Sequence, residues 1–586
     1  MFMNKYYLLI TLMLCLGCSP DSLTTVYEYT QPYNNESNNT TDITPVAPVI
    51  DDSKWADDSI SGTKFDLTIS IVFSDDGVQV TGDTKGIVSV EGGNVTVNNT
   101  SGEKVKYELS GTCRNGSLKL YSSKKHAIVL NGLELTNPNG AAINNQCKKS
   151  CFVVVNGTNS LTDGTTYSST LADEDEKAAL FSEGQLIFSG DGTLNVTAKG
   201  KSGINSDDYV HIMESPVINV TSSAGHGIRG KDAVVISGGS IGVNVSANMK
   251  KGIVSDSLVY ICGGATIINI SGAASYDADD AEYKGTSGIK ADSLFYITGG
   301  TVHVVNSGKG GKGISGDGIG CFNGGSVRVN TTGSNYGQSS SGRRGSSSSN
   351  SVSAKGIKFD GNLFFQDGTV NVSCTAHEGV ESKAHILVNG GVIYSHSEAD
   401  DAINSAKTFT IQGGKVCGYA VSNDGLDANG NFYIKGGLVY AFGSGVPELA
   451  IDANTEGGCR LYVEGGTIIA IGGLESGSSL TQSCYSASSW SKSTWYSMTV
   501  GNYVLAFTTP SSGGTTLVVS GASQPTLKSG VTVSGGTSLF EGMLTTDGSV
   551  SGGTSVNLSS YTSGNSGGFS PGGGFGPGGG GRPGGW

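Results

Sequence analysis

The sequence predicts an all-β protein built as a parallel β-helix, in which short strands stack coil upon coil. Two observations predict it: a Gly-Ile pair recurs, mostly at steps of 23 to 25 residues, and from Gly227 to Gly425 a Gly-Gly or Asp-Gly pair begins 11 residues after each anchor. A period of this size marks a repeat protein, because one repeat cannot bury its own apolar face. The anchors, softened forms included, are Gly203, Gly227, Gly252, Gly288, Gly313, Gly356, Gly379, Ala402, Gly425 and Ala450.

Each repeat is composed of short strands separated by glycine-marked corners. After Gly252 the chain runs through Ser257–Ile261, a glycine pair and Ala265–Ile270, which are rich in Ile, Val, Tyr and Thr. Such residues favour strands, and glycine pairs supply corners with positive φ. The isoleucine after each anchor is expected to form an internal aliphatic ladder. Leucine-rich repeats lack support because their Leu frame is absent, and a propeller blade needs a longer period.

Composition divides the chain into five parts. Residues 1–18 form a signal peptide and 19–60 a disordered tether of Ser, Thr, Asn, Asp and Pro. Residues 61–475 form the β-helix, 476–562 a small β-rich module or cap, and 563–586 a Gly/Pro-rich disordered tail. The β-helix carries two insertions, which in a solenoid map to loops that often flank the binding face.

The first residues predict export and lipidation. A cationic start and a short apolar run precede Leu16-Gly17-Cys18, which resembles a bacterial lipobox although Cys15 departs from the usual Leu. Cys18 would then be the lipidated first residue of the mature protein. A plain secretory signal would also export the chain. Ser19 does not suggest inner-membrane retention, so we expect an outer-membrane lipoprotein facing either the periplasm or the cell surface.

Charge and cysteine usage exclude several function classes. A net charge of −14 argues against nucleic-acid binding. The seven histidines form no His-x-x-x-His pair, and the cysteines have no metal-type spacing. Cys147 and Cys151 are close enough to pair across a turn, whereas most others occupy unrelated offsets and are expected in the core.

Stacking places equal offsets from the anchors one above another, and these columns change sign along the chain. Offset plus four is mostly Asp or Asn, which suits a turn. Beside the anchors the early coils carry lysines that could meet the carboxylates of uronic acid polymers. The candidate carbohydrate-binding lysines are Lys250, Lys251, Lys290, Lys312, Lys355 and Lys358. Neighbouring aromatic residues could stack on sugar rings, although packing on the outer strand face is favoured for any single one: Tyr209, Tyr260, Phe295, Tyr296, Phe364 and Phe365.

The later coils are acidic at the same offsets. Asp401-x-x-Asn404 and Asp424-x-x-Asp427 repeat one phrase one coil apart. Stacked carboxylates repel unless a cation lies between them, and oxygen ligands favour Ca²⁺. A solvated acidic face is the alternative. The candidate metal ligands are Asp400, Asp401, Asn404, Asp424, Asp427 and Asp452. The acidic insertion with Asp277, Asp279, Asp280 and Glu282 is a second, weaker calcium candidate.

An ordered string of motifs adds a family resemblance over residues 64–473. The motifs are Tyr107–Thr112, Val129–Asn137, Gly140–Ile143, Asn156–Gly164 and Ala178–Phe181, followed by the Gly-Ile coils. The chain resembles the bacterial carbohydrate-binding β-helix domain of a clostridial cellulose- and polygalacturonate-binding protein. The resemblance implies a right-handed parallel β-helix, bound calcium and non-catalytic polysaccharide binding, with an architectural likeness to pectate lyases. It fixes no ligand residues.

Three functions follow from these features. The first is a non-catalytic, envelope-anchored polysaccharide-binding protein with an acidic or plant-type ligand. The second is a calcium-dependent polysaccharide lyase, whose base would be Lys407 or Lys435. The third is an adhesin or passive surface structure without a specific sugar ligand.

Overall fold

The computed structural model describes residues 45–168, 173–337 and 351–563. The chain divides into two compact units: residues 1–272 with 287–302, and residues 273–286 with 303–586. Apart from two short 3₁₀ helices, η1 (Asp52–Asp58) and η2 (Ile60–Gly62), the regular structure in these ranges is β-strand. The signal peptide with Cys18, most of the predicted tether and nearly all of the predicted tail lie outside the described residues.

Unit 1 stacks its strands coil upon coil. The sheet that carries the Gly-Ile anchors contains β3 (Val88–Glu91), β4 (Gly93–Asn99), β6 (Gly116–Ser122), β8 (Ile143–Asn145), β11 (Ala178–Ser182), β14 (Ser202–Ser206), β17 (Ile228–Gly230), β20 (Lys251–Ser255) and β25 (Ser287–Ala291). The other strands are β1 (Leu67–Ser74), β2 (Gly77–Thr81), β5 (Val105–Cys113), β7 (His126–Thr136), β9 (Cys151–Asn156), β10 (Thr158–Thr162), β12 (Leu186–Ser189), β13 (Thr193–Ala198), β15 (Tyr209–Ile212), β16 (Val217–Ser222), β18 (Ala233–Ile236), β19 (Ser240–Val245), β21 (Leu258–Ile261), β22 (Ala265–Ile270) and β26 (Leu294–Ile297).

Unit 2 repeats the arrangement, and the unit boundary falls within β27 (Thr301–Asn306). Its anchor strands are β28 (Lys312–Gly316), β30 (Lys355–Phe359), β32 (Val380–Ser382), β35 (Ile403–Ser405) and β38 (Leu426–Ala428). The remaining coil strands are β29 (Ile319–Thr331), β31 (Leu363–Cys374), β33 (Ile386–Val388), β34 (Val392–Ser397), β36 (Phe409–Ile411), β37 (Lys415–Ala420), β39 (Phe432–Ile434), β40 (Leu438–Phe442), β41 (Leu461–Val463), β42 (Thr467–Ile471) and β43 (Ser479–Leu480). A short hairpin is formed by β23 (Ser275–Asp277) and β24 (Glu282–Lys284).

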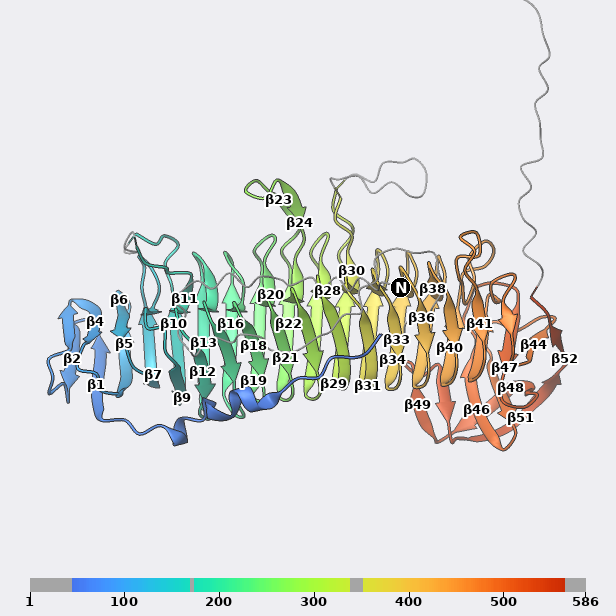
Figure 1. Ribbon diagram of the computed structural model, residues 1–586, viewed down its shortest axis with the longest axis horizontal. Helices are drawn as coiled ribbons and strands as arrows, with labels where there is room; N and C mark the ends of the chain where they lie inside the picture. Colours follow the sequence, from blue (N-terminus) through green and yellow to red (C-terminus); the bar gives the residue numbers. More distant parts are fainter. Residues whose placement is uncertain (1–44, 169–172, 338–350, 564–586) are drawn as a thin grey trace, which may run out of the picture. The chain divides into compact units, whose positions relative to one another are not determined.

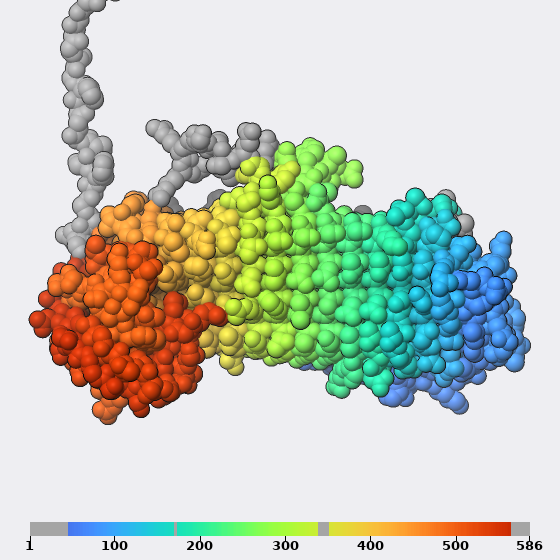
Figure 2. Space-filling view, turned by 180° about the vertical axis from the view of Figure 1, so that it is seen from behind, coloured from blue at the N-terminus to red at the C-terminus, as the bar shows by residue number. Residues whose placement is uncertain are grey.

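The predicted parallel β-helix is confirmed in both units. In unit 1 the parallel register pairs Ile204 with Ile228, Ile228 with Ile253 and Ile253 with Ile289, all fully buried. In unit 2 the same ladder runs from Ile314 to Leu426. Figures 1 and 2 show that successive turns within each unit follow the colour order of the sequence, as expected when each repeat contacts only its neighbours.

The anchor glycines are explained by close packing inside the coil. A Cβ on Gly252 would lie 2.5 Å from Ile268 Cγ2 and 2.6 Å from the Gly288 carbonyl oxygen. Any larger residue at this anchor would therefore push apart two strands and the next coil. The glycine pairs at the corners are explained by backbone conformation. Gly264 has a φ of 74°, which residues other than glycine rarely adopt.

The end of the predicted 19–60 tether is ordered, and that boundary is corrected. Helix η1 lies on the outer face of unit 1, where the buried Asp58 carboxylate accepts a hydrogen bond from the Tyr209 hydroxyl at 2.6 Å and pairs with His211 Nδ1 at 2.6 Å. The Trp55 ring lies 5.8 Å from that of Tyr260. Polar composition predicted disorder here, but one indole and one carboxylate with buried partners are enough to dock the segment.

Within the range predicted as a small β-rich module or cap, β43 still pairs in parallel with β41 of the coils, and antiparallel strands begin at Cys484. Strands β44 (Cys484–Ala487), β47 (Leu517–Ser520) and β52 (Leu558–Tyr561) pair at the end of unit 2. A six-stranded sheet contains β45 (Trp495–Val500), β46 (Tyr503–Thr508), β48 (Thr526–Ser534), β49 (Thr537–Leu539), β50 (Leu544–Thr546) and β51 (Ser549–Val556). It shares a core with outer residues of the last coils, including Tyr440 and Phe442.

The structure also tests the expectation for the cysteines. All nine cysteines of the described ranges are free, Cys147 and Cys151 included, and seven of the nine are buried as expected for small core residues. Among the described residues, none of the helices has the length and apolar character needed to cross a membrane.

Candidate functional site

Three columns of side chains surround the anchors of unit 2, and the backbone fixes their stacking. The anchor N–H of Gly356 donates to the Glu378 carbonyl at 3.2 Å, that of Gly379 to Asp401 at 3.2 Å, and that of Ala402 to Asp424 at 3.0 Å. Residues that directly precede an anchor are therefore joined to the adjacent coil by one hydrogen bond per step.

The column at offset plus two has the register that the repeated phrase predicted. Lys358 pairs with Glu381, Glu381 with Asn404 and Asn404 with Asp427. The predicted order, basic residues followed by acidic ones along one edge, is thus confirmed within unit 2. The two columns that precede the anchors contribute His377, Asp400 and Asn423, and Lys355, Glu378, Asp401 and Asp424.

Lys355 does not face solvent as the sugar-binding prediction required. It is 7% exposed, and its ammonium pairs with Glu378 Oε2 at 2.9 Å and with Glu381. Glu381 also pairs with Lys383 on the surface. Burial would lower the pKa of Lys355, but the charges of Glu378 and Glu381 outweigh it and raise the pKa. Lys355 is therefore corrected from a sugar ligand to the centre of a buried ion-pair network.

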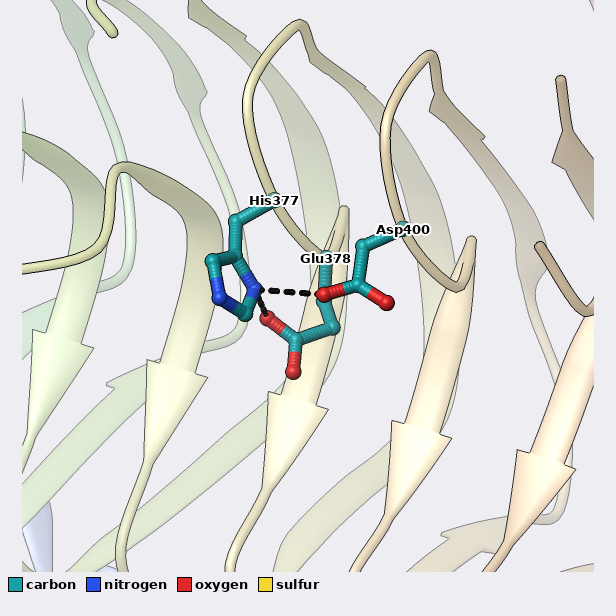
Figure 3. Close-up of side chains that lie close together, drawn as sticks. All are labelled: His377, Glu378 and Asp400. Carbon is teal, nitrogen blue, oxygen red and sulfur yellow. Dashed lines mark hydrogen bonds and ion pairs between the residues drawn. The ribbon is translucent and has the colours of Figure 1, made fainter. Parts of the chain in front are cut away.

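His377 extends this network to Asp400 (Figure 3). Its Nδ1 contacts a Glu378 carboxylate oxygen and lies 2.9 Å from Asp400 Oδ2. Burial would lower the pKa of His377, but hydrogen bonds to Asp400 and Glu378 outweigh it and raise the pKa to about 9. Burial would raise the pKa of both carboxyl groups, but hydrogen bonds to His377 and its charge outweigh this and lower the pKa of Glu378 and of Asp400.

His377 was not predicted as a site residue, because only the acidic residues and asparagines of these columns were considered as ligands. The signal was present, since His377 lies 23 residues before Asp400, one coil away at the same offset. With Lys355 and imidazolium on one side and Glu378 and Asp400 on the other, these charges balance without a metal ion at neutral pH.

Beyond Asp400 the carboxylates lose their cationic partners. Within the described ranges, none of Asp401, Asp424, Asp427 and Asp452 forms an ion pair. Burial and then neighbouring carboxylates raise the pKa of Asp401 well above its usual value. Burial is also the main reason that the pKa of Asp424 and of Asp427 rises to about 7 and that of Asp452 to about 10.

These four carboxyl groups offer only oxygen atoms, but no three of them bring ligand atoms within 4.8 Å of one another among the described residues. Asp401 accepts from Asn404 Nδ2 at 2.9 Å, and Asp424 N–H donates to Asp401 Oδ1 at 3.2 Å. Buried carboxylates that raise one another's pKa gain most from a divalent ion with oxygen ligands. Of the five aspartates in the predicted ligand set, only Asp400 belongs to such a cluster, and its partners there are His377 and Glu378.

The second calcium candidate is occupied by a lysine. Lys284 pairs with Asp277 at 3.0 Å, with Asp280 and with Glu282 at 3.7 Å. A similar arrangement occurs in unit 1, where Asp175, Glu183 and Asp207 gather and Lys177 pairs with Asp175 at 2.7 Å and Asp207 at 2.6 Å. In both clusters an ammonium already supplies the positive charge that a metal ion would bring.

The predicted lysines of unit 1 gather around the half-buried His226. Burial, followed by the charges of Lys251, Lys250, Arg229 and Lys290, lowers the pKa of His226 well below its usual value. Lys290 pairs with Asp292 at 2.8 Å, and Lys251 Nζ donates to the Met249 carbonyl at 2.7 Å. In unit 2, Lys358 pairs with Asp360, and Lys312 lies beside Lys355 in the register.

The proposed sugar-stacking aromatics are buried, so the packing interpretation holds for them. Their exposed fractions are Tyr209 7%, Tyr260 4%, Phe295 0%, Tyr296 6%, Phe364 0% and Phe365 1%. Tyr209 and Tyr260 contact the N-terminal segment, and Phe365 stacks on Phe322 at 5.2 Å. None of the six offers a ring face to a sugar in this structure.

Comparison with known proteins now places the chain. Residues 91–402, more than half of it, match the family described as carbohydrate-binding domain-containing protein, and the chain belongs to this family. This membership confirms the family resemblance of the sequence and supports a polysaccharide as partner. The solved structure of a polysaccharide lyase-like protein from C. thermocellum, a gadolinium derivative, is similar at 20% identity and a TM-score of 0.33, covering 50% of this chain and 96% of that one. No curated protein matches significantly.

Replacing His377 tests the ion-pair network. A histidine whose pKa is raised by folding stabilises the fold fully below its unfolded value near 6.5 and loses that contribution as pH rises through about 9. The free energy of unfolding should therefore fall between pH 7 and 10 by more in the wild type than in His377→Gln, measured by urea denaturation. His396→Gln in β34 is the control and should keep the wild-type slope; an identical slope in His377→Gln would contradict the network.

Proposed function

We propose that this protein is a non-catalytic polysaccharide-binding protein of the bacterial cell envelope that contains calcium and takes an acidic or plant-type polysaccharide. Membership of the carbohydrate-binding family carries the proposal. The long repeated faces of the two β-helical units suit a polymer, because a polysaccharide repeats its own groups along its length.

Calcium is proposed at the carboxylates beyond Asp400. The donor set of Asp401, Asp424, Asp427 and Asp452 is all oxygen, and their raised pKa values support a site that favours added positive charge. When bound, calcium would supply that charge. The chain's own residues then keep the carboxylates in register, Asn404 donating to Asp401 and the Leu449 N–H to Asp424.

The calcium proposal predicts a pH-dependent stabilisation. An acid whose pKa is raised to about 7 favours the fold while protonated, so in EDTA this contribution should fall as pH rises from about 4 to 7. Calcium requires the ionised form, so it should raise Tm more at pH 8 than at pH 5. In Asp424→Asn combined with Asp427→Asn, the calcium-induced rise in Tm should disappear.

The matched control is Asp367→Asn, an exposed carboxylate at a corner of unit 2, which should respond to calcium as the wild type does. Equal loss of stability with calcium and with EDTA in the double variant would show that these carboxylates have a purely structural role. Isothermal titration of the metal-free protein with calcium alone gives the same answer independently of Tm.

Activity separates binding from the lyase alternative. A lyase needs a base near the cation, and the candidate bases are exposed: Lys407 follows β35, and Lys435 follows β39 with its Nζ 5.1 Å from the Tyr433 ring centroid. We expect the protein to retain polygalacturonate or a plant polysaccharide in a glycan-binding screen with calcium, with no unsaturated product absorbing in the ultraviolet. Turnover that Lys435→Met abolishes would establish the lyase, and binding to no glycan would favour the adhesin.

Anchoring is proposed through a lipid on Cys18, outside the described residues, at the outer membrane with the β-helix facing the periplasm or the surface. The Cys18→Ser variant should move from the membrane fraction to the soluble fraction after cell breakage. Its retention in the membrane fraction would contradict the lipid anchor.

A further inference from the structure

The hairpin β23–β24 of unit 2 presents a tyrosine where the repeat has no need of one. Tyr276 is 49% exposed, the largest exposed fraction among the aromatic side chains of the described ranges. Figure 1 shows β23 and β24 standing out from the stacked turns, and the light-green lobe at the top of Figure 2 agrees. A large aromatic side chain on a projecting hairpin contributes little to a core, so its position points to recognition.

The hairpin is built to hold this ring. Tyr276 lies directly opposite Tyr283 in the antiparallel register, with ring centroids 5.1 Å apart at an interplanar angle of 61°. Tyr283 in turn lies 5.9 Å from Tyr336, which bridges to Val352. A two-stranded hairpin alone is marginal in water, so these cross-strand and tertiary aromatic contacts orient it.

The geometry of the pair leaves ring surface uncovered. An edge-to-face pair occupies the face of only one ring, whereas stacked rings cover each other's faces. Elsewhere in unit 2, Tyr433 and Tyr462 stack at 4.7 Å and 9°, and Tyr433 is 8% exposed. The hairpin pair is thus the tyrosine arrangement of this unit suited to receive a further ring.

Charge decides which sugar chemistry fits. Lys284 pairs with Asp277, Asp280 and Glu282, and Asp279 brings the hairpin to four carboxylates against one ammonium, a net charge of −3. An exposed negative surface repels a polymer of uronic acids. Carboxylate oxygens also accept hydrogen bonds from hydroxyl groups, which uncharged pyranose rings carry in abundance.

We infer that the β23–β24 hairpin is a stacking site for uncharged polysaccharide, with Tyr276 as the platform and the carboxylates around Lys284 as hydroxyl acceptors. The inference rests on the proposed polysaccharide-binding function and adds a second, calcium-independent contact of different charge preference. Tyr283 and Tyr336 act as positioning residues that hold the platform.

Affinity gel electrophoresis with hydroxyethyl cellulose, arabinoxylan and polygalacturonate tests the site in EDTA and in calcium. We expect Tyr276→Ala to weaken binding of the uncharged polymers about tenfold, equivalent to about 1.4 kcal/mol, in both media, and Tyr276→Trp to restore it. Tyr503→Ala in β46, where Tyr503 is the other exposed tyrosine of the described ranges at 38%, should bind as the wild type does. Added NaCl should not weaken binding to the uncharged polymers.

Three other outcomes would each contradict a different part of the inference. If the wild type binds an uncharged polymer and Tyr276→Ala binds it equally, the hairpin is not the site, while the proposed function stands. If the wild type retains only polygalacturonate, the charge argument is wrong. If the wild type binds none of the polymers, the hairpin inference and the proposed function fall together.

Discussion

The fold depends on one constraint, the parallel hydrogen bond between each strand and its equivalent in the next coil. Because the side-chain period of a strand is two, a slip of one residue would turn every isoleucine of the ladder outward. The anchor glycines enforce the register, since a Cβ on Gly252 or Gly356 would collide with the carbonyl oxygen of the next anchor, at 2.6 and 2.3 Å. The chemistry of the molecule is therefore organised in columns, and each residue's neighbours are determined by its offset.

Columns make electrostatics cumulative. At the offset before the anchor, unit 2 reads Lys355, Glu378, Asp401 and Asp424, and this change of sign separates two regimes. Lys355 and His377 balance Glu378 and Asp400: the pKa values of the two cations rise, and those of the two carboxyl groups fall. The next coils contribute carboxylates without an ion-pair partner, and burial and mutual repulsion raise the pKa of Asp401, Asp424 and Asp427. The columns beside the anchors of unit 2 thus hold a charge-balanced segment and, in the following coils, a segment of carboxylates without ion-pair partners.

The sequence was sufficient for the fold, the repeat boundaries and the register of Asn404 with Asp427, because periodicity states which positions stack. It did not predict which way individual side chains point, or which of them a distant segment of the chain covers. Lys355 was predicted to face solvent, yet the carboxylates of the next coil draw it inward. Tyr209 and Tyr260 were candidates for sugar stacking, yet a segment more than 140 residues earlier contacts both. The offset of a residue predicts its neighbours in adjacent coils. It does not predict contacts with a segment from outside the repeats that packs across several coils.

The segment around η1 is such a crossing, and its attachment has a mechanical consequence. Asp58 joins the chain to Tyr209 and His211, far along the sequence from β1, where the coils begin. A force applied to the chain before Asp51 would act on the Asp58 contacts before it reached Leu67, the first residue of β1. The contacts of Asp58 and Trp55 with the side of unit 1 would therefore bear the tension first. A force on the N-terminal segment would not unwind the first coil until these contacts had broken.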